Sequence, residues 1–304
     1  MKRLLIAGCG DVATRALPLL AKTYRLCALA RSTSEVARLR GLGVEASLAD
    51  LDYPKSLSAV DFNADCVLHS VPPPGAGVGD VRTRHLIEAL LRAADAAGAT
   101  ARDDSGAQPK RRIVYLSTSG VYGDCKGEWV DETRAVNPMT PRAARRVDAE
   151  RQLQYFTQES GLSLVILRVP GIYAADRLPL ERLRGGTPVL RAKDDVYSNH
   201  IHAEDLASII AIACQAENTE GIFNTSDDTE MKMGDYFDLV ADRHGLSRPP
   251  RISRADAARE VSPELLSFWN ESRRLVNARM KTRLGVTLRY PTVSEGVPTL
   301  VEVR

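Results

Sequence analysis

The first 170 residues alternate short apolar runs with stretches of helical periodicity, and this alternation restricts the fold more than any other feature. The β-branched and leucine residues of these runs are continuous, which is typical of strands covered by helices on both faces. The pattern therefore predicts an α/β fold with a doubly wound parallel sheet. Six runs are predicted strands: Arg3–Gly8, Arg25–Ala30, Val44–Leu48, Cys66–Val71, Ile113–Ser117 and Leu164–Val169.

The intervening segments have helical spacing, as in Arg82–Ala97, where Leu86, Ile87, Leu90 and Leu91 form one apolar face. Gly98–Lys110 has no such periodicity and is predicted to be a surface loop.

Beyond residue 171 the pattern is less regular. A helix over Glu204–Gln215 and a strand over Ile222–Asn224 predict a return to the sheet, and further helices are predicted over Met233–His244 and Pro263–Trp269. We expect residues 1–170 and about 186–226 to form one domain. Residues 171–185 and 227–304 are expected to form a smaller substrate-binding cap over the carboxyl edge of the strands, where doubly wound folds bind ligands.

The first predicted strand runs into a GxGxxA turn, Gly8-Cys9-Gly10-Asp11-Val12-Ala13, and then into a helix. Two glycines let the backbone turn tightly and approach a pyrophosphate, whose charge is favoured at the amino end of a helix. The position between strand and helix in a series of βα units predicts dinucleotide binding. Asp11 suits the helix dipole but would repel a nearby phosphate, so we expect its side chain to point away.

The residue after the second strand distinguishes two dinucleotides, because an acid there accepts from a ribose 2′-hydroxyl whereas an arginine holds a 2′-phosphate. Arg31-Ser32 stands at this position, so NADP is favoured over NAD. Asp50 and Leu51 follow the third strand and are expected to bracket an adenine. The alternative for this segment is a simple helix cap before Tyr53-Pro54.

The charge composition excludes a protein built mainly to bind nucleic acid, because 41 Lys and Arg residues nearly balance 39 Asp and Glu residues. Residues 1–40 nevertheless carry eight basic residues against two acidic ones, which suggests a site for a small anion in this segment.

No apolar run approaches the roughly 18 residues that span a bilayer, so we expect no membrane partner and a cytoplasmic location. Five separated cysteines without CxxC spacing indicate neither a zinc site nor a disulfide framework.

Four segments together resemble the NAD-dependent epimerase/dehydratase branch of the extended short-chain dehydrogenase/reductase superfamily, which has a Rossmann fold. They are the Gly8-x-Gly10 turn, Ser117–Gly123 (STSGVYG), Leu167–Tyr173 (LRVPGIY) and Ile201–Ala207 (IHAEDLA). The resemblance implies cofactor contacts at the ends of several strands. The expected set is Gly8, Cys9, Gly10, Asp11, Val12, Arg31, Ser32, Asp50, Leu51, Ser70, Val71, Pro72, Ser117, Arg146 and Pro170.

The resemblance also implies a catalytic set, and here the chain departs from the family pattern. Thr118 matches the residue that hydrogen-bonds the reacting hydroxyl. Arg142 and Arg146 stand where the tyrosine and lysine of a YxxxK pair belong. An arginine, with a pKa above about 12, is a poor general base at neutral pH. Arg146 keeps a cation and donors for the cofactor ribose.

Two functions remain open from the sequence. The first is an NAD(P)-dependent oxidoreductase or epimerase of the atypical extended type, acting on a small polar substrate that is either phosphorylated or sugar-derived. The second is a non-catalytic protein that binds or senses NADP(H) and has lost the chemistry of the family. The resemblance also implies a homodimer, since relatives often pair through two helices.

Four aromatic residues offer alternative chemistry. His200 and His202 share one face of a predicted strand before Glu204-Asp205, but nothing else completes a metal site, so we expect structural hydrogen bonds there. The alternative role for His200 is that of an acid or base that substitutes for the missing tyrosine. Tyr122 and Tyr173 are expected to be exposed at the edge of the sheet, as pocket lining or as proton carriers.

Overall fold

The computed structural model describes residues 1–96 and 111–299, so the predicted loop Gly98–Lys110 lies outside the described part. The chain divides into two compact units. The first comprises Met1–Thr118, Pro141–Arg168 and Ala207–Phe223, and the second comprises Ser119–Thr140, Val169–Leu206 and Asn224–Arg304.

A seven-stranded parallel sheet forms the centre of the first unit, in the order β12-β7-β5-β4-β1-β2-β3. Every strand predicted from the sequence is present, with ends displaced by a few residues. The strands are β1 (Lys2–Ala7), β2 (Tyr24–Ala30), β3 (Glu45–Leu48), β4 (Cys66–His69), β5 (Arg112–Thr118), β7 (Ser163–Val169) and β12 (Gly221–Asn224).

The order of the strands reverses at β1. This strand pairs with β2 through Ala7 and Leu29 and with β4 through Ala7 and His69, so the carboxyl ends of all three strands lie at one level. The chain passes from β1 outward through β2 and β3, then returns to β4 and continues in the opposite direction. In a doubly wound sheet, the reversal leaves a crevice outside the carboxyl ends of the strands.

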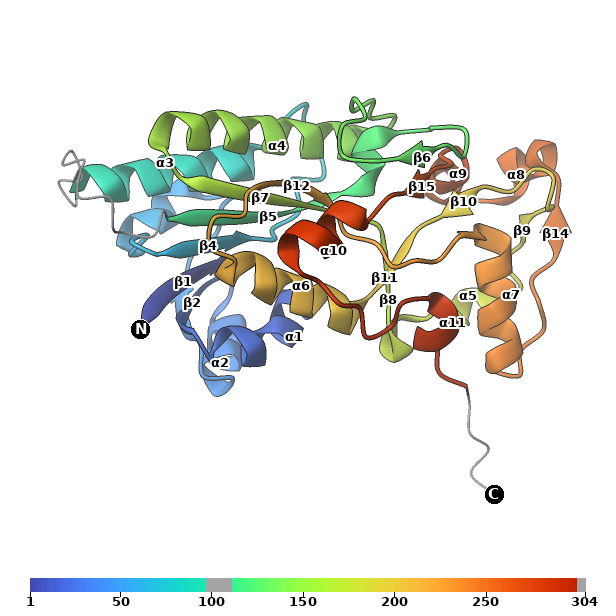
Figure 1. Ribbon diagram of the computed structural model, residues 1–304, viewed down its shortest axis with the longest axis horizontal. Helices are drawn as coiled ribbons and strands as arrows, with labels where there is room; N and C mark the ends of the chain where they lie inside the picture. The colour runs from blue at the N-terminus through green and yellow to red at the C-terminus, as the bar shows by residue number, and fades with distance from the viewer. Residues whose placement is uncertain (97–110, 300–304) are drawn as a thin grey trace, which may run out of the picture. The chain divides into compact units, whose positions relative to one another are not determined.

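Helices cover both faces of this sheet: α3 and α4 lie on one face, and α1, α2 and α6 lie on the other (Figure 1). The two-sided cover explains why the strands are apolar throughout rather than alternating. The helices and short 3-10 segments are α1 (Asp11–Leu20), α2 (Thr33–Gly41), η1 (Pro54–Ala59), α3 (Val81–Ala96), α4 (Pro141–Ser160) and α6 (Ala203–Gln215).

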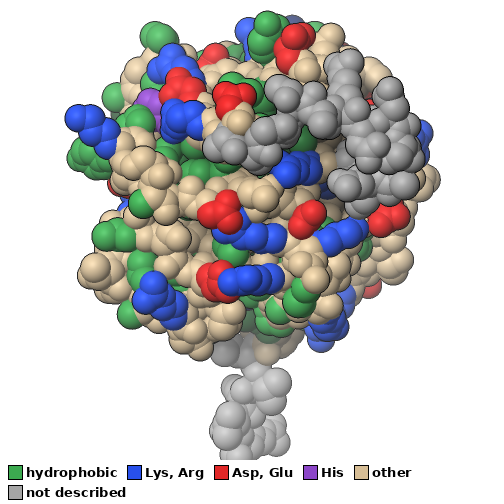
Figure 2. Space-filling view, turned by 90° about the vertical axis from the view of Figure 1, so that its left-hand side faces the viewer, with side chains coloured by type: hydrophobic (Ala, Val, Ile, Leu, Met, Phe, Trp, Pro, Cys, Tyr) green, Lys and Arg blue, Asp and Glu red, His purple; other side chains and the backbone are tan. Residues whose placement is uncertain are grey.

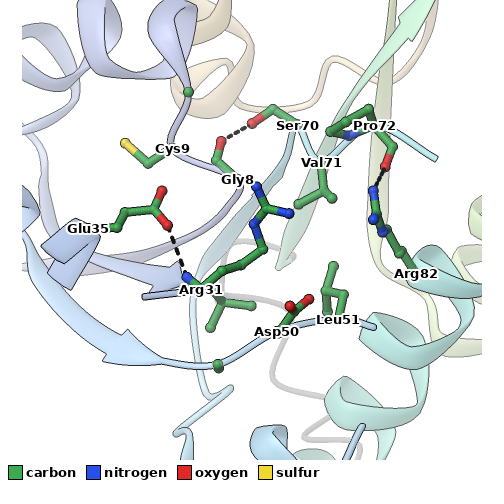
Figure 3. Close-up of a pocket in the computed structure, with 13 residues that line it drawn as sticks. Gly8, Cys9, Arg31, Glu35, Asp50, Leu51, Ser70, Val71, Pro72 and Arg82 are labelled. Carbon is green, nitrogen blue, oxygen red and sulfur yellow. Dashed lines mark hydrogen bonds between the residues drawn. The ribbon is translucent and has the colours of Figure 1, made fainter. Parts of the chain in front are cut away.

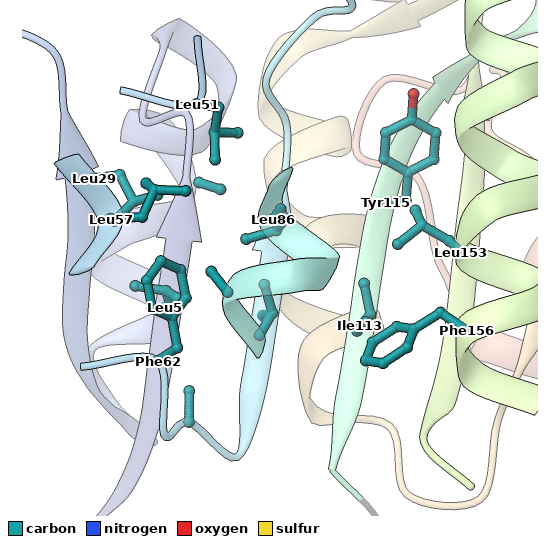
Figure 4. Packing of buried hydrophobic residues seen from close by; sticks show 14 of the residues in the cluster. Leu5, Leu29, Leu51, Leu57, Phe62, Leu86, Ile113, Tyr115, Leu153 and Phe156 are labelled. Carbon is teal, nitrogen blue, oxygen red and sulfur yellow. The ribbon is translucent and has the colours of Figure 1, made fainter. Parts of the chain in front are cut away.

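The main core of the first unit packs the strands against α3 and α4. Leu5, Leu86 and Ile113 are buried in it, and Leu153 and Phe156 contribute from α4 (Figure 4). Each such side chain stabilises the fold by about 1.5–3 kcal/mol relative to exposure. The same cluster includes Leu29, Ala49 and Leu51 at the carboxyl ends of β2 and β3, so the core reaches the edge where a ligand is expected.

The second unit consists of short elements with four two-stranded pairings, β10-β13, β11-β8, β14-β9 and β15-β6. Its own core includes Tyr173, Tyr236, Phe237 and Val240. The strands are β6 (Trp129–Val130), β8 (Gly171–Tyr173), β9 (Val189–Leu190), β10 (Tyr197–Ser198), β11 (His200–His202), β13 (Met231–Lys232), β14 (Arg251–Ile252) and β15 (Arg274–Leu275). The helices are η2 (Ser119–Tyr122), η3 (Ala175–Arg177), α5 (Leu180–Arg184), α7 (Met233–Arg243), α8 (Arg254–Glu260), α9 (Pro263–Trp269), α10 (Ala278–Leu284) and α11 (Val293–Gly296).

Basic and acidic side chains lie beside one another on the face shown in Figure 2. Near the amino ends of the central strands, Arg3 pairs with Asp61 at 2.6 Å and Arg25 pairs with Glu45 at 2.5 Å. The basic excess of residues 1–40 is therefore partly compensated by acids from later in the chain.

Candidate functional site

The turn after β1 is built from two glycines that the structure requires for different reasons. Gly8 has φ +90, and a Cβ there would lie 2.8 Å from the backbone nitrogen of Val71. Gly10 has φ −76 and ψ −167 and is the N-cap of α1, with no side chain capping the helix. A Cβ on Gly10 would meet no heavy atom within 4 Å. Gly8 thus permits close packing of β1 on the loop after β4, while Gly10 keeps a space open beside the amino end of α1.

A cavity of about 210 Å³ lies at this turn, entirely within the first unit (Figure 3). It occupies the place where the strand order reverses, between the carboxyl ends of β1, β2, β3 and β4. Its described lining residues are Gly8, Cys9, Gly10, Leu29, Arg31, Glu35, Ala49, Asp50, Leu51, Ser70, Val71, Pro72 and Arg82.

One side of the cavity is formed where β2 leads into α2. The side chain of Arg31 extends into the cavity toward Gly8 and Val71 (Figure 3). Its backbone N–H donates to the Glu35 carboxylate at 2.9 Å. The Ser32 hydroxyl caps α2 by accepting from the Glu35 backbone N–H at 3.2 Å. The cap fixes the backbone from which Arg31 extends.

Two further walls of the cavity are formed by the segment after β3 and by the segment after β4, which face each other. Asp50 and Leu51 face Val71 and Pro72 across the cavity (Figure 3). The Ser70 hydroxyl donates to the Gly8 carbonyl oxygen, which joins the segment after β4 to the glycine turn. Apolar side chains and two charged groups of each sign, Arg31 and Arg82 against Glu35 and Asp50, line the described cavity.

Most of the residues predicted to contact a cofactor line this cavity. Among the residues predicted, Asp11 and Ser32 lie beside the cavity rather than in its lining, and Asp11 pairs with Arg15 at 3.0 Å on the first turns of α1. Val12, Ser117 and Arg146 do not line the cavity either, and Pro170 belongs to the second unit. The predicted residues that do line it are Gly8, Cys9, Gly10, Arg31, Asp50, Leu51, Ser70, Val71 and Pro72.

Four lining residues were not predicted: Leu29, Glu35, Ala49 and Arg82. Leu29 and Ala49 end or follow strands, so the carboxyl-edge rule could have indicated them. The sequence indicates Glu35 only weakly, because an acidic residue three positions after Ser32 is typical of the start of a helix. Arg82 carries no local signal, since its partners lie on two other segments of the chain.

The candidate catalytic residues lie in the first unit, outside the cavity lining. Thr118 ends β5 and is half-buried, and Arg142 is an exposed residue in the first turn of α4. The Arg146 guanidinium donates to the Leu116 carbonyl oxygen at 2.6 Å and to the Tyr115 hydroxyl at 3.1 Å. Arg146 is therefore held against the carboxyl end of β5.

Tyr115 does not supply the phenol that the family resemblance places at Arg142. Its side chain is fully buried, and burial raises the pKa of its hydroxyl. His69 packs against its ring, with 5.0 Å between the ring centroids, and burial lowers the pKa of His69 to about 3. Both side chains are neutral at pH 7 and serve as core.

Ser117 belongs to a buried polar network outside the described cavity lining. Its hydroxyl donates to the Glu150 carboxylate. Arg168 on β7 binds the same carboxylate through two nitrogens, at 3.2 and 2.7 Å. Both charged side chains are only 4% exposed. The polar atoms of this network tie β5, β7 and α4 together.

The aromatic candidates of the second unit have structural roles. Tyr122 and Tyr173 are both 1% exposed, so the expectation that they lie open at the edge is wrong. Their hydroxyls donate to the Asn224 side chain and to the Thr292 carbonyl oxygen. Their burial follows from the packing of the second unit around them, which local sequence does not reveal.

His200 and His202 are buried on β11, as a structural interpretation requires. The Nδ1 atom of His202 accepts from the Glu204 backbone N–H at 3.2 Å. Burial lowers the pKa of His200 to about 4. Asp205 accepts from the backbone N–H groups of Arg289 and Tyr290.

The described residues provide no group of metal ligands, no disulfide and no membrane-spanning helix. Residues 1–96 and 111–299 hold no group of three or more His, Cys, Asp or Glu residues placed to bind a metal ion. All five cysteines are buried and outside disulfides. Within the same ranges, no helix has the length and apolar character needed to cross a membrane.

The strand order, the glycine turn and the cavity at the reversal point define a Rossmann-type fold of the class that binds dinucleotides. Residues 10–225 match the model of the NAD dependent epimerase/dehydratase family, and the chain belongs to this family.

Known proteins are similar to this chain over most of its length. A structure of a conserved protein of unknown function from Silicibacter pomeroyi DSS is 30% identical, with a TM-score of 0.77 over 97% of this chain and 96% of that chain. Protein YeeZ of Escherichia coli (strain K12) is 24% identical over 265 residues, which are 85% of this chain and 90% of YeeZ.

A UDP-glucose 4-epimerase of Thermus thermophilus, solved in complex with NAD, has a TM-score of 0.70 over 97% of this chain and 96% of its own. Its identity of 21% makes this a likeness of fold alone.

Proposed function

We propose that the chain is an NADP-dependent oxidoreductase or epimerase that acts on a small polar, sugar-derived substrate. The observation that carries the proposal is the cavity at the Gly8–Gly10 turn, with the Arg31 side chain extending into it (Figure 3). The residues present fit a dinucleotide, because Gly10 leaves open the space that a Cβ would fill beside the amino end of α1. The family of the chain supports the reaction class.

The proposed binding mode assigns one part of the dinucleotide to each side of the cavity. The backbone N–H groups of the turn, through Asp11 and Val12, hold the pyrophosphate. Arg31 and the Ser32 hydroxyl hold the 2′-phosphate, which is the group that distinguishes NADP from NAD. Asp50 and Leu51, with the facing residues Ser70–Pro72, enclose the adenine.

The proposed catalytic residues lie near the carboxyl end of β5. A bound nicotinamide dinucleotide supplies hydride transfer at such a site. Thr118 donates a hydrogen bond to a substrate oxygen. Arg146, fixed by the Leu116 carbonyl oxygen, places positive charge beside the cofactor ribose, and Arg142 offers a second cation for an anionic substrate group. The smaller region of the chain, residues 171–185 and 227–304, is proposed to bind the substrate.

Titration of the purified protein with NADPH and NADH tests the cofactor. We expect tighter NADPH binding, and Arg31→Gln should weaken NADPH binding about 10- to 150-fold, since a charge-assisted hydrogen bond contributes roughly 1.5–3 kcal/mol. NADH should change much less. Arg40→Gln, in the helix α2 that follows Arg31, is the control, because Arg40 does not line the described cavity. Tighter binding of NADH by the wild type would overturn the role of Arg31.

A second function is favoured by one observation. Arg142 and Arg146 stand where the resemblance expects the tyrosine and lysine of the YxxxK pair. In this alternative, the protein binds or senses NADP(H) without hydride chemistry.

The double variant Arg142→Tyr with Arg146→Lys separates the two functions. We expect it to create or raise dehydrogenase activity on a panel of hydroxyl and carbonyl compounds if the site is otherwise competent. Absence of activity in the wild type and in this variant, with NADPH binding retained, would favour the sensor. We also infer a homodimer by analogy with relatives of this fold, which light scattering tests.

A further inference from the structure

Arg82 links two segments that lie on opposite sides of the cavity. Its Nε and Nη2 atoms donate to the two carboxylate oxygens of Asp52, at 2.7 and 2.6 Å. Its Nη1 atom donates to the Pro72 carbonyl oxygen at 2.9 Å (Figure 3). Asp52 follows β3 and Pro72 follows β4, so one guanidinium joins the loops after these two strands.

The link spans a wide gap in the sheet. β1 and β2 lie between β4 and β3, and neighbouring strands are about 4.8 Å apart, so the two strands are separated by about 14 Å. The cavity lies above the carboxyl ends of the two strands between them. Arg82 therefore closes one end of the cavity by bridging its opposite sides.

The bridge has the properties of a fixed element rather than a loose surface pair. The Arg82 side chain is 16% exposed and the Asp52 side chain 35%. The hydrogen bonds from Arg82 hold the pKa of the Asp52 carboxyl below its usual range. A planar guanidinium with two parallel bonds to one carboxylate has a defined geometry.

A second contact from α3 holds the same loop. The Nδ1 atom of His85, three residues after Arg82, lies 2.6 Å from the Leu51 carbonyl oxygen. A carbonyl oxygen only accepts, so Nδ1 donates in this contact. Leu51 and Asp52 are thus both attached to α3, and the Leu51 side chain is held at a fixed distance from Val71 and Pro72.

We propose that Arg82 and Asp52 are positioning residues that preorganise an adenine slot between Leu51 on one side and Val71 and Pro72 on the other. The inference rests on the proposed dinucleotide binding. A flat purine gains contact with both apolar walls only when their spacing is fixed in advance, and preorganisation removes an ordering cost from binding. Asp52 does not line the described cavity, so it acts on the ligand only through Arg82.

Calorimetric titration with 2′,5′-ADP and with nicotinamide mononucleotide tests the proposal. We expect Asp52→Asn and Arg82→Gln each to weaken 2′,5′-ADP about tenfold, and the double variant to weaken it by little more, because the two residues act as one unit. Nicotinamide mononucleotide should bind as in the wild type. Arg82→Lys should recover part of the affinity, since lysine keeps the charge but not the paired bonds.

The exposed pair Arg25 and Glu45, at 2.5 Å on the same sheet, provides the matched control. Arg25→Gln should leave both affinities unchanged. A less than twofold effect of Asp52→Asn on 2′,5′-ADP, or an equal loss for nicotinamide mononucleotide, overturns the positioning role. Failure of the wild type to bind NADPH and 2′,5′-ADP at all overturns the proposed function instead. If Arg82→Gln does not fold, Asp52→Asn alone decides.

Discussion

Substitution of the two glycines of the first turn should separate ligand binding from folding. The Gly10 backbone, at φ −76 and ψ −167, is accessible to any residue, and its new Cβ would meet nothing within 4 Å. Loss of the glycine N-cap destabilises the folded protein, whereas the reduced conformational freedom of the unfolded chain stabilises it, so the two effects partly cancel. Gly10→Ala should therefore change the free energy of unfolding by no more than about 1 kcal/mol.

The same methyl group would fill space that a bound pyrophosphate needs. An extra methyl group in a closely packed contact costs about 1–3 kcal/mol, which corresponds to about a 5- to 150-fold loss of NADPH affinity. Gly8→Ala should behave in the opposite way. Its positive φ costs about 1–2 kcal/mol, and the contact at 2.8 Å with the Val71 backbone adds a further cost of about 1–3 kcal/mol to folding.

Urea unfolding and NADPH titration of the two variants give the result directly. Gly41→Ala is the control, because Gly41 also has nothing within 4 Å of a Cβ and lies in α2, outside the described cavity lining. Wild-type NADPH affinity in Gly10→Ala would refute the assignment of the turn as the phosphate site. Greater destabilisation by Gly10→Ala than by Gly8→Ala would refute the packing argument.

Two further predictions concern buried charges. Glu150→Gln should destabilise the protein by about 3–5 kcal/mol in urea unfolding, because it leaves the buried Arg168 guanidinium without its counter-charge; a loss below about 1 kcal/mol would contradict this. Burial raises the pKa of Asp227 to about 7, above its unfolded value of about 3.9, so its contribution to stability falls as pH rises through this window. The free energy of unfolding of Asp227→Asn, relative to that of the wild type, should therefore rise by up to about 1.4 kcal/mol per pH unit between about pH 4 and 7 and stay level above pH 7. A difference that does not change with pH would contradict the raised pKa of Asp227.

The central strands could be predicted because each is a self-contained apolar run. β7 illustrates why: all of its residues are buried, so its sequence shows no alternation. Strand ends were less predictable. The fourth strand ends at His69 rather than at Val71, because the Ser70 hydroxyl bonds the Gly8 carbonyl oxygen and Val71 packs beside Gly8.

The candidate site was predictable where it is local in sequence and not elsewhere. The turn at Gly8 and Gly10 and the position of Arg31 follow from the order of strand, turn and helix. Arg82 depends on contacts with Asp52 and Pro72, 30 and 10 residues away, and no local pattern encodes such contacts.

Charge counting along the sequence was similarly limited. Residues 1–40 carry a basic excess, but Arg31 is the one basic residue of that segment among the described cavity lining. Arg3, Arg15 and Arg25 form ion pairs elsewhere on the first unit. A linear window cannot show which charges meet acids from other strands.

A crystal structure after soaking with NADPH is the most direct test of dinucleotide binding. We predict the pyrophosphate beside Gly10 at the amino end of α1, the 2′-phosphate against Arg31 and the adenine between Leu51 and Val71. An empty cavity at saturating NADPH, or a dinucleotide bound elsewhere on the protein, would contradict the proposed function.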